Sequence, residues 1–371
     1  MKEGWVYKKL GEVCEILNGF AFKSNLYIPN GIRVIRITNV QKGYIEDKDP
    51  KFYPDETLDE LRKYVLNEND LLISLTGNVG RVGIIDKSLL PAYLNQRVGC
   101  IRVKNKEELL MPYLYFLLNS NSFENDCVLS SRGAAQKNMS TVWLSEYEIP
   151  IPSLFDQRRI VSRLDSAFSH IDELKAKAEK QLSEAKALFQ KALAEEMKPK
   201  EGWVYKKLGE VANVVHGKNQ KDVFSKSGQY PIYGSGGNIM GYADDFLCEA
   251  GTTILGRKGS INNPQFIKER FWNVDTAFGI SAKKGNDSKF IYYFIKGIDW
   301  SKKNTGTTLP SLTQLVVKSV DIPVPSLEYQ RRIVSHLDAL SSQVHQLEEN
   351  CRKTLAECDA LKQAMLREVF E

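Results

Sequence analysis

Basic and amide side chains gather in glycine-rich turns at several points of the 371-residue chain. The clearest turns read GNVGRVG from Gly77, SSRGAAQKN from Ser130, HGKNQK from His216 and GRKGSINN from Gly256. Arginine pairs with guanine, and asparagine or glutamine with adenine, through two hydrogen bonds each, whereas lysine mostly neutralises phosphate. Each turn on its own is better explained as an ordinary solvated loop. Together the turns predict a set of candidate DNA contacts: Arg81, Arg97, Gln136, Lys137, Lys218, Asn219, Arg257, Lys258 and Thr307.

Two segments of the sequence resemble catalytic motifs, but neither matches its motif. GTTILGRKG from Gly251 resembles a phosphate-binding loop, but Lys258 falls one position late and no Ser or Thr follows it directly. PDETLDELRK from Pro54 suggests a cluster of nuclease carboxylates, yet its periodicity predicts a surface helix instead. There is no G-x-S-x-G motif and no dinucleotide-binding fingerprint. The sequence therefore predicts no catalytic residue.

The cysteines and histidines do not form a metal-binding pattern. None of the six cysteines forms a C-x-x-C pair, and the four histidines are scattered. This predicts neither a disulfide scaffold nor a metal site, and it favours a reducing cytoplasm. Cys351 and Cys358 are expected in a helix core. The N-terminus has no apolar run like that of a signal peptide and no stretch is long enough to span a membrane, so we expect a cytoplasmic protein without membrane contact.

Two long segments of the sequence occur twice. EGWVYKKLGEV starts at Glu3 and again at Glu201, an offset of 198, and IPIPSLFDQRRIVSRLD at Ile149 returns as IPVPSLEYQRRIVSHLD at Ile322, an offset of 173. The blocks between them, 14–148 (block one) and 212–321 (block two), share almost no sequence, and block one is 25 residues longer. We interpret this contrast as two copies of one plan whose blocks contact different ligands. Drift after a recent duplication is the alternative.

A long helix is predicted after each repeated proline-rich joint. Pro152 and Pro325 cannot continue a helix, and Ser153 and Ser326 are suitable N-caps. Heptad spacing predicts a buried seam on each helix. The predicted seam positions are Leu164, Ala167, Ile171, Leu174, Ala178, Ala185, Leu188 and Ala192 in the first helix and Leu337, Leu340, Val344, Leu347, Cys351, Cys358, Leu361 and Met365 in the second.

The direction of the two helices follows from the short linker between the copies. Only Lys198, Pro199 and Lys200 separate the first helix from the second copy, so the second helix can cover the first one's seam only by running back along it. We therefore expect an antiparallel pair, each helix about 60 Å long at 1.5 Å per residue. A parallel coiled coil between two chains is the alternative.

Both blocks carry short strand patterns followed by a helix. Strands are predicted at RVIRIT from Arg33, DLLISLT from Asp70 and VGCIRV from Val98 in block one, and at TTILGR and FGISA in block two. The helices are expected at LLMPYLYFLLNS and KFIYYFIK. The fold class is thus α+β: two α+β domains joined by two long antiparallel coiled-coil helices, with a pseudo-twofold internal repeat.

At this point the chain resembles the specificity subunit of type I restriction-modification systems. The resemblance rests on KLGEV at Lys9 and Lys207, on P-x-P-S-L-x-x-Q-R-R-I-V at Pro150 and Pro323, and on the long helix after each joint. It implies that 1–152 and 198–325 are target-recognition domains, each recognising one half of a bipartite asymmetric DNA site. It also implies that 153–197 and 326–371 are spacer helices that set the gap between the half-sites.

The resemblance further implies partners and cofactors. Two methyltransferase subunits would dock on the helices and methylate N6 of adenine with S-adenosylmethionine, and two restriction and translocase subunits would use ATP and Mg²⁺. This chain would bind double-stranded DNA, hold no cofactor and catalyse nothing. The shared QRRIVS would serve docking or packing through Gln157, Arg158, Arg159, Gln330, Arg331 and Arg332.

Two other function classes remain open at this stage: a coiled-coil adaptor whose blocks bind proteins, and an enzyme with an unrecognised site in block one. Net charge does not decide between them. Block two carries 14 basic and 9 acidic residues, but block one carries 16 and 17, so charge alone does not predict a nucleic-acid binder there.

Overall fold

The computed structural model describes residues 4–57, 59–131, 138–306 and 309–371. The chain forms two compact units. Unit 1 comprises Met1–Lys177 together with Lys353–Glu371, and unit 2 comprises Ala178–Arg352. Each unit therefore contains one of the two blocks and a segment of each long helix.

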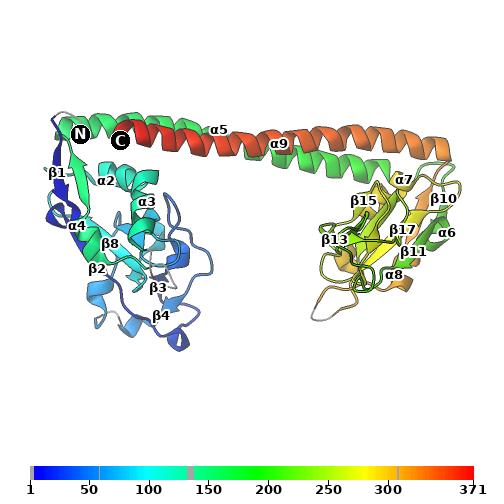
Figure 1. Ribbon diagram of the computed structural model, residues 1–371, viewed down its shortest axis with the longest axis horizontal. Coiled ribbons are helices and arrows are strands. Elements are labelled where there is room, and N and C mark those ends of the chain that lie inside the picture. Colours follow the sequence, from blue (N-terminus) through cyan, green and yellow to red (C-terminus); the bar gives the residue numbers. More distant parts are fainter. Residues whose placement is uncertain (1–3, 58, 132–137, 307–308) are drawn as a thin grey trace. The chain divides into compact units, whose positions relative to one another are not determined.

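Unit 1 is built on a four-stranded antiparallel sheet with the strand order β2-β8-β5-β6. Figure 1 labels β2 and β8 of this sheet. A second sheet, β4-β3-β7, contains the parallel pair β3 and β7, and β1 pairs with β9. The strands are β1 Val6–Lys9, β2 Cys14–Asn18, β3 Ile32–Ile35, β4 Phe52–Tyr53, β5 Leu71–Ser74, β6 Val82–Ile84, β7 Ala92–Leu94, β8 Val98–Val103 and β9 Glu148–Ile151. The short helices are α1 Leu10–Val13, α2 Met111–Leu118, α3 Asn121–Ser130 and α4 Thr141–Glu146. The core forms where α2 packs on β5 through Leu71, Ile73, Tyr113 and Leu114.

Unit 2 repeats this topology although its block shares almost no sequence with block one. Its sheets have the orders β11-β17-β14-β15 and β13-β12-β16, the pair β12 and β16 is again parallel, and β10 pairs with β18. The strands are β10 Val204–Lys207, β11 Ala212–His216, β12 Tyr230–Tyr233, β13 Ile239–Ala243, β14 Thr252–Gly256, β15 Gln265–Ile267, β16 Trp272–Asn273, β17 Ala277–Ala282 and β18 Asp321–Val324. The helices are α6 Leu208–Val211, α7 Ser288–Lys296 and α8 Gln314–Lys318. The predicted strands and block helices are all present, and the α+β prediction is confirmed.

Most of the extra length of block one lies in two connections. The segment between β3 and β4 has 16 residues, 36–51, whereas the β12–β13 connection has only five, 234–238. The segment between β4 and β5 has 17 residues, 54–70, against eight in 244–251. The sheets of the two units therefore have the same strand topology. Block one differs mainly by the longer loops before and after β4.

The surface helix predicted at PDETLDELRK is wrong. The described part of this segment forms two 3₁₀ turns, η3 Asp55–Thr57 and η4 Arg62–Tyr64. After η4 the chain is extended, because the Leu66 amide donates to the Ala92 carbonyl and the Leu66 side chain is buried. This tertiary pairing outweighs the local helical periodicity.

The two long helices are α5 Leu154–Glu196, with 43 residues, and α9 Leu327–Phe370, with 44. Ser153 and Ser326 cap them as predicted: their hydroxyls accept from the amides of Asp156 (3.2 Å) and Tyr329 (3.3 Å).

Within each unit the segments of α5 and α9 run antiparallel, because pairing positions rise along one helix as they fall along the other. Unit 1 pairs Lys175 with Asp359 (2.7 Å), Asp172 with Lys362 (2.6 Å) and Arg163 with Glu368 (2.9 Å). Unit 2 pairs Lys186 with Glu348 (2.5 Å) and Glu196 with His336 (2.8 Å). The antiparallel prediction is confirmed.

The seam of α5 differs from the prediction at two of its eight positions. Leu174 and Leu188 are 54% and 61% exposed, whereas Phe189 and Leu193 are buried and Phe168 and Leu182 half-buried. Of the other six predicted positions, Leu164 and Ile171 are buried, and the four alanines, Ala167, Ala178, Ala185 and Ala192, are half-buried. In α9 the seam holds, except that Leu361 is 52% exposed and Leu366 and Val369 are buried instead. Apolar residues occupy both registers of α5, so periodicity could not choose between them.

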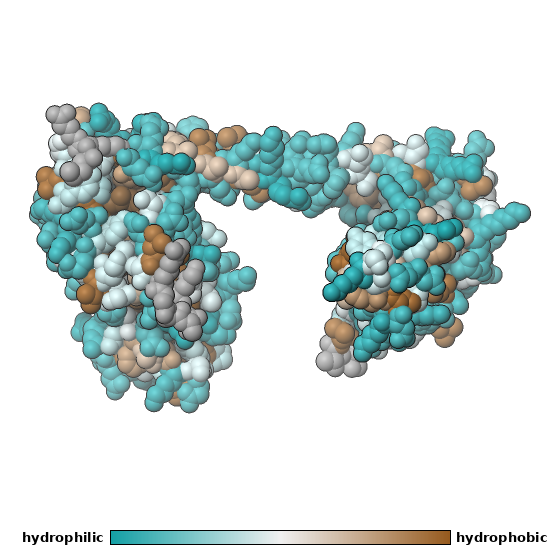
Figure 2. All heavy atoms as spheres, in the orientation of Figure 1, coloured by the Kyte–Doolittle hydropathy of each residue, from teal (hydrophilic) through white to brown (hydrophobic). Residues whose placement is uncertain are grey.

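The surface of both units is mostly polar in the view of Figure 2, with apolar residues in small patches. All six cysteines are buried and free. In the described residues, no helix is long and apolar enough to cross a membrane. Nor do these residues contain a group of three or more His, Cys, Asp or Glu side chains able to hold a metal ion.

Candidate nucleic-acid interface

In unit 1, segments that are far apart in sequence meet at one edge of the four-stranded sheet. β2 and β5 end at this edge, and the antiparallel strand β8 begins there. The Leu75 amide donates to the Arg97 carbonyl (3.0 Å), and the Met139 amide donates to the Leu75 carbonyl (2.8 Å). Thr76 and Asn138 form a β-bridge beside them. We call this edge, with the turn that follows β5, the polar edge of unit 1.

The equivalent edge of unit 2 has the same backbone pattern with different side chains. The Arg257 amide donates to Thr276 (2.8 Å), the Leu312 amide donates to Arg257 (2.9 Å), and Lys258 and Ser311 form the β-bridge. Arg257 thus takes the place of Leu75. The two polar edges share one scaffold and present unlike side chains.

The candidate contacts of block one lie at or beyond this edge. Arg97 is exposed beside Leu75, and Arg81 is half-buried at the end of the β5–β6 turn. The Arg81 amide donates to the Ser74 hydroxyl (3.0 Å), and the Ser74 amide donates to the Arg81 carbonyl (2.9 Å). The structure therefore brings Arg81 and Arg97 next to consecutive residues of one strand end. Gln136 and Lys137 lie outside the described residues.

The candidate contacts of block two also gather at the polar edge. Lys258 is exposed, and the half-buried Arg257 donates through Nη1 to the Asp275 carbonyl (3.2 Å). Lys218 and Asn219 are exposed just beyond β11, and the Lys218 amide donates to Asn273 (2.9 Å). Thr307 lies outside the described residues.

His216, at the end of β11, reports on the electrostatics of this edge. Partial burial lowers the pKa of its imidazole, and the positive charges of Arg257 and Lys318 lower that pKa further. The two cations near His216 contribute a positive local field at this edge, which suits an anionic ligand.

Sequence reasoning missed a pocket beside the polar edge of unit 1. It has a volume of about 380 Å³, and it lies between the β5–β6 turn and the long connection 36–51. Its lining residues are Arg36, Ile37, Thr38, Gln41, Glu46, Lys48, Asp49, Asn78 and Arg81. We call it the 36–51 pocket.

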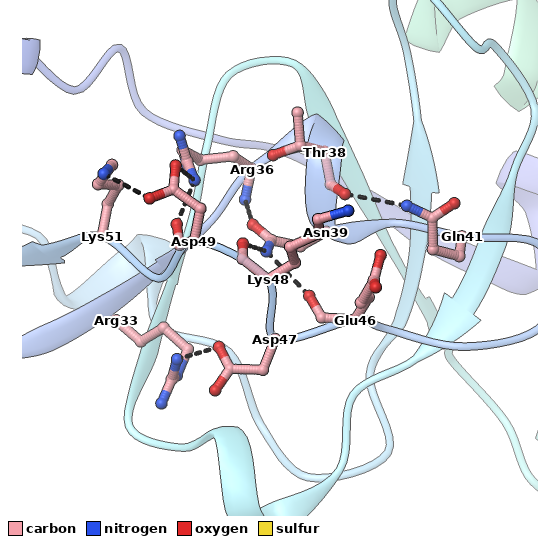
Figure 3. Close-up of polar contacts among 10 residues, drawn as sticks. All are labelled: Arg33, Arg36, Thr38, Asn39, Gln41, Glu46, Asp47, Lys48, Asp49 and Lys51. Carbon is pink, nitrogen blue, oxygen red and sulfur yellow. Dashed lines mark hydrogen bonds and ion pairs between the residues drawn. The ribbon is translucent and has the colours of Figure 1, made fainter. Parts of the chain in front are cut away.

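The connection 36–51 is ordered by its own polar contacts (Figure 3). The buried Asn39 accepts from the Arg36 amide (2.9 Å) and donates to the carbonyls of Glu46 (2.9 Å) and Lys48 (3.2 Å). Arg36 donates to the carbonyl of Asp49 (2.5 Å). Hydrogen bonds from Lys51 and from Arg36 hold the pKa of the Asp49 carboxyl below its usual value. The extra length of this connection was visible in the sequence, but its closure around Asn39 was not.

The glutamines of the repeated QRRIVS lie inside the units. Gln157 is fully buried, accepts from the Leu110 amide (2.8 Å), and donates to the carbonyls of Glu108 (2.8 Å) and Pro152 (2.9 Å). Gln330 is buried in the same way, accepting from the Asp287 amide (2.8 Å) and donating to Pro325 (3.0 Å). Each glutamine thus ties the start of a long helix to the segment that enters α2 or α7.

The arginines of the same motif face solvent. Arg158, Arg159, Arg331 and Arg332 are all exposed, and Arg159 pairs with Asp156 at 2.9 Å. Both units therefore present the same two arginines at the start of the long helix.

We expect Gln157→Leu to destabilise unit 1, because it leaves the Leu110 amide and the Glu108 and Pro152 carbonyls without the buried partner that they share. The free energy of unfolding should fall by about 2–3 kcal/mol. Thermal and urea unfolding of the purified chain measure the change, with Arg158→Ala as the control on the exposed face. Equal midpoints for the two variants would contradict the assigned role of Gln157.

The geometry defines a protein with two like-folded modules that offer unlike polar edges on a shared pair of helices. The profile of the family described as "Type I restriction modification DNA specificity domain" matches residues 2–184 and 200–357. The chain therefore belongs to this family and contains two copies of its domain.

Curated relatives match either part or most of the chain. The EcoAI type I restriction enzyme specificity subunit of Escherichia coli is 31% identical over 184 residues, which cover 47% of this chain and 30% of that protein. The MjaVIII specificity subunit of Methanocaldococcus jannaschii is 31% identical over 188 residues, covering 50% and 44%. The chain thus spans less than half the length of these two relatives. A putative MjaX specificity subunit of the same archaeon is 24% identical over 379 residues, covering 91% and 87%.

Solved structures share the fold. A chain from a study of the assembly and conformational transition of the type I R-M system has a TM-score of 0.77 at 21% identity, with coverage of 100% of this chain and 98% of the other. The HsdS subunit from Thermoanaerobacter tengcongensis has a TM-score of 0.54 at 20% identity, with coverage of 100% and 97%.

Proposed function

We propose that this chain is the DNA-specificity subunit of a type I restriction-modification complex. Residues 1–152 and 198–325 act as target-recognition domains, and each recognises one half of a bipartite asymmetric site. The observation that carries the proposal is the pair of polar edges, which have the same backbone scaffold and unlike side chains. One scaffold with two side-chain sets suits two different half-sites in one double-stranded DNA.

The candidate contacts divide into two kinds by their chemistry. Arg81, Arg257 and Asn219 have the fork-like donors or the amide suited to base edges. Lys218 and Lys258 suit phosphates, whose neutralisation supplies affinity without sequence information. Arg97 is exposed at the polar edge and can serve either purpose. Gln136, Lys137 and Thr307 remain proposed contacts from the sequence alone.

The helices 153–197 and 326–371 set the gap between the half-sites and dock two methyltransferase subunits. The identical exposed pairs Arg158–Arg159 and Arg331–Arg332 support this role, because one partner could bind both copies in the same way. The partners supply the chemistry: S-adenosylmethionine serves N6-adenine methylation, and ATP and Mg²⁺ serve two restriction and translocase subunits. This chain recognises DNA and does not catalyse, and its ligand places it in the cytoplasm.

Adenine methylation mapped across the genome tests the proposal. Cells expressing the chain with its neighbouring methyltransferase should gain one split motif, methylated on both strands, that is absent from cells without the chain. Arg158→Glu with Arg331→Glu should lose both the copurifying methyltransferase and the motif while the chain still folds.

Other outcomes separate the competing functions. No motif, together with no salt-dependent DNA binding by the copurified complex, would support the adaptor function instead. Methyl transfer or DNA cleavage by the purified chain alone would show it to be an enzyme.

A further inference from the structure

The half-buried arginines of block one differ in the groups that hold them. Among the described residues, Arg33 pairs with Asp47, Arg36 with Asp49, and Arg102 with Asp70. Arg81 has no carboxylate partner in the part of the chain that the structure describes, and its Nη1 donates to the neutral amide oxygen of Gln41 (2.8 Å). A guanidinium held by a carboxylate has its charge compensated inside the protein, but one held by an amide keeps its full charge for an external acceptor.

From this arrangement we infer that Arg81 recognises a guanine in the half-site bound by unit 1, and that Gln41 is the positioning residue that orients it. The inference rests on the proposed function and adds to it one base, one recognising residue and one residue that acts through it.

The Gln41 amide is oriented before DNA arrives. Its Nε2 donates to the Thr38 carbonyl (3.0 Å; Figure 3). This leaves Oε1 to accept from Arg81 Nη1. The Arg81 backbone is fixed as well, through its hydrogen bonds with Ser74. The guanidinium is therefore held at its base and at one nitrogen, so little side-chain entropy is lost when it binds a base.

The remaining donors of Arg81 match guanine and not adenine. A guanidinium has five N–H donors, and the described residues provide only one hydrogen-bond partner for this one. Nη2 and Nε can donate side by side to O6 and N7 of guanine in the major groove. Adenine places an amino donor at the position of O6, so one donor would face another.

The 36–51 pocket provides room for this contact. Arg81 lines the pocket together with Gln41, Thr38 and Asn78, on the side of the polar edge. The second arginine in its wall, Arg36, is already held by Asp49. Arg81 is therefore the arginine in this wall whose charge has no carboxylate partner. In unit 2 the half-buried Arg257 is also held by a neutral group, the Asp275 carbonyl.

Methylome mapping of variants in the complex with the methyltransferase tests the inference. Arg81→Lys keeps the charge but loses the paired donors, so discrimination for guanine at one position should fall about tenfold to a hundredfold. Gln41→Leu leaves Arg81 in place without its orienting contact and should relax the same position to a smaller degree. Arg62→Lys, an exposed arginine outside the pocket, is the matched control.

The readout separates recognition from general loss of structure. A merely structural role would weaken binding evenly, whereas the inference requires change at one position, with the other half-site and the gap unchanged. Full discrimination by Arg81→Lys, or a unit 1 half-site without guanine on either strand, would overturn the inference and leave the proposed function standing. A wild-type complex without any motif would overturn both.

Discussion

Replacement of residues 212–321 by the corresponding block of another family member should change one half of the recognised sequence completely. The other half and the gap should stay as they are. The physical reason is that the four-stranded sheet, α7 and the polar edge of unit 2 all lie within these residues. The exchange joins the chain just after Val211, in the repeated lead-in, and just before Ile322, in the repeated joint. Three of the four residue pairs between β10 and β18 therefore stay native, and only Asp321, opposite Lys207, is exchanged.

The exchanged block must still fit the helices beneath it. Phe189 and Leu193 of α5 and Ile333 and Leu337 of α9 belong to the core of unit 2 and stay with the recipient. A donor whose joint carries the same apolar residues is therefore the suitable choice, and thermal unfolding of the chimera checks the fit. Methylome mapping gives the outcome. If both half-sites change, the assignment of one half to each block is wrong. The reciprocal exchange of 14–148 should change only the opposite half.

Removal of one heptad from each long helix should shorten the unread gap and leave both half-sites intact. Residues 178–184 of α5 and 350–356 of α9 are the matched pair, because they lie between the ion pairs Lys175–Asp359 and Lys186–Glu348. Seven residues are about 10.5 Å of helix, which equals about three base pairs at 3.4 Å each. Seven residues also turn the helix by nearly two full turns, so the apolar seam keeps its face.

The design includes two comparisons. Deletion of residues 178–184 from α5 alone should abolish methylation. The seam residues of α5 would then no longer all lie opposite the α9 residues that they face in the wild-type chain. A variant in which the same heptads are replaced at constant length by other residues with the same seam should keep the wild-type gap. An unchanged gap after the paired deletion would show that the helices do not set it. The motif again comes from mapped methylation.

The parts that sequence predicted well are those determined by neighbours along the chain. The capping serines, the joints and the antiparallel direction of the helices follow from local rules and a three-residue linker. The exposure of Leu188 did not follow, because the buried Phe189 beside it is equally apolar. Only packing in the core of unit 2 distinguishes the two.

The residues of the site were also predictable only where neighbours along the chain determine them. Arginine and lysine in glycine-rich turns were visible as candidates, but the edge that gathers them depends on strand pairing between residues such as Leu75, Arg97 and Met139. The sequence did not identify Gln41, because the role of this residue depends on the orientation of its side-chain amide. The hydrogen bond to the Thr38 carbonyl determines that orientation. A positioning residue of this kind is identified only after the loop has closed.

The division of the chain into units also has a consequence for how the protein is made. Unit 2 is one continuous stretch, whereas unit 1 needs Lys353–Glu371 to complete it. Leu366 and Val369 from that segment are buried against Phe116 and Leu164, and the ring of Phe370 packs on Tyr113 at 5.5 Å. A ribosome delivers these residues after all of unit 2, and domains fold as their chains emerge. Unit 2 is therefore the first unit whose residues have all been synthesised. In unit 1, the seam of the α5 segment stays uncovered until Lys353–Glu371 has been synthesised.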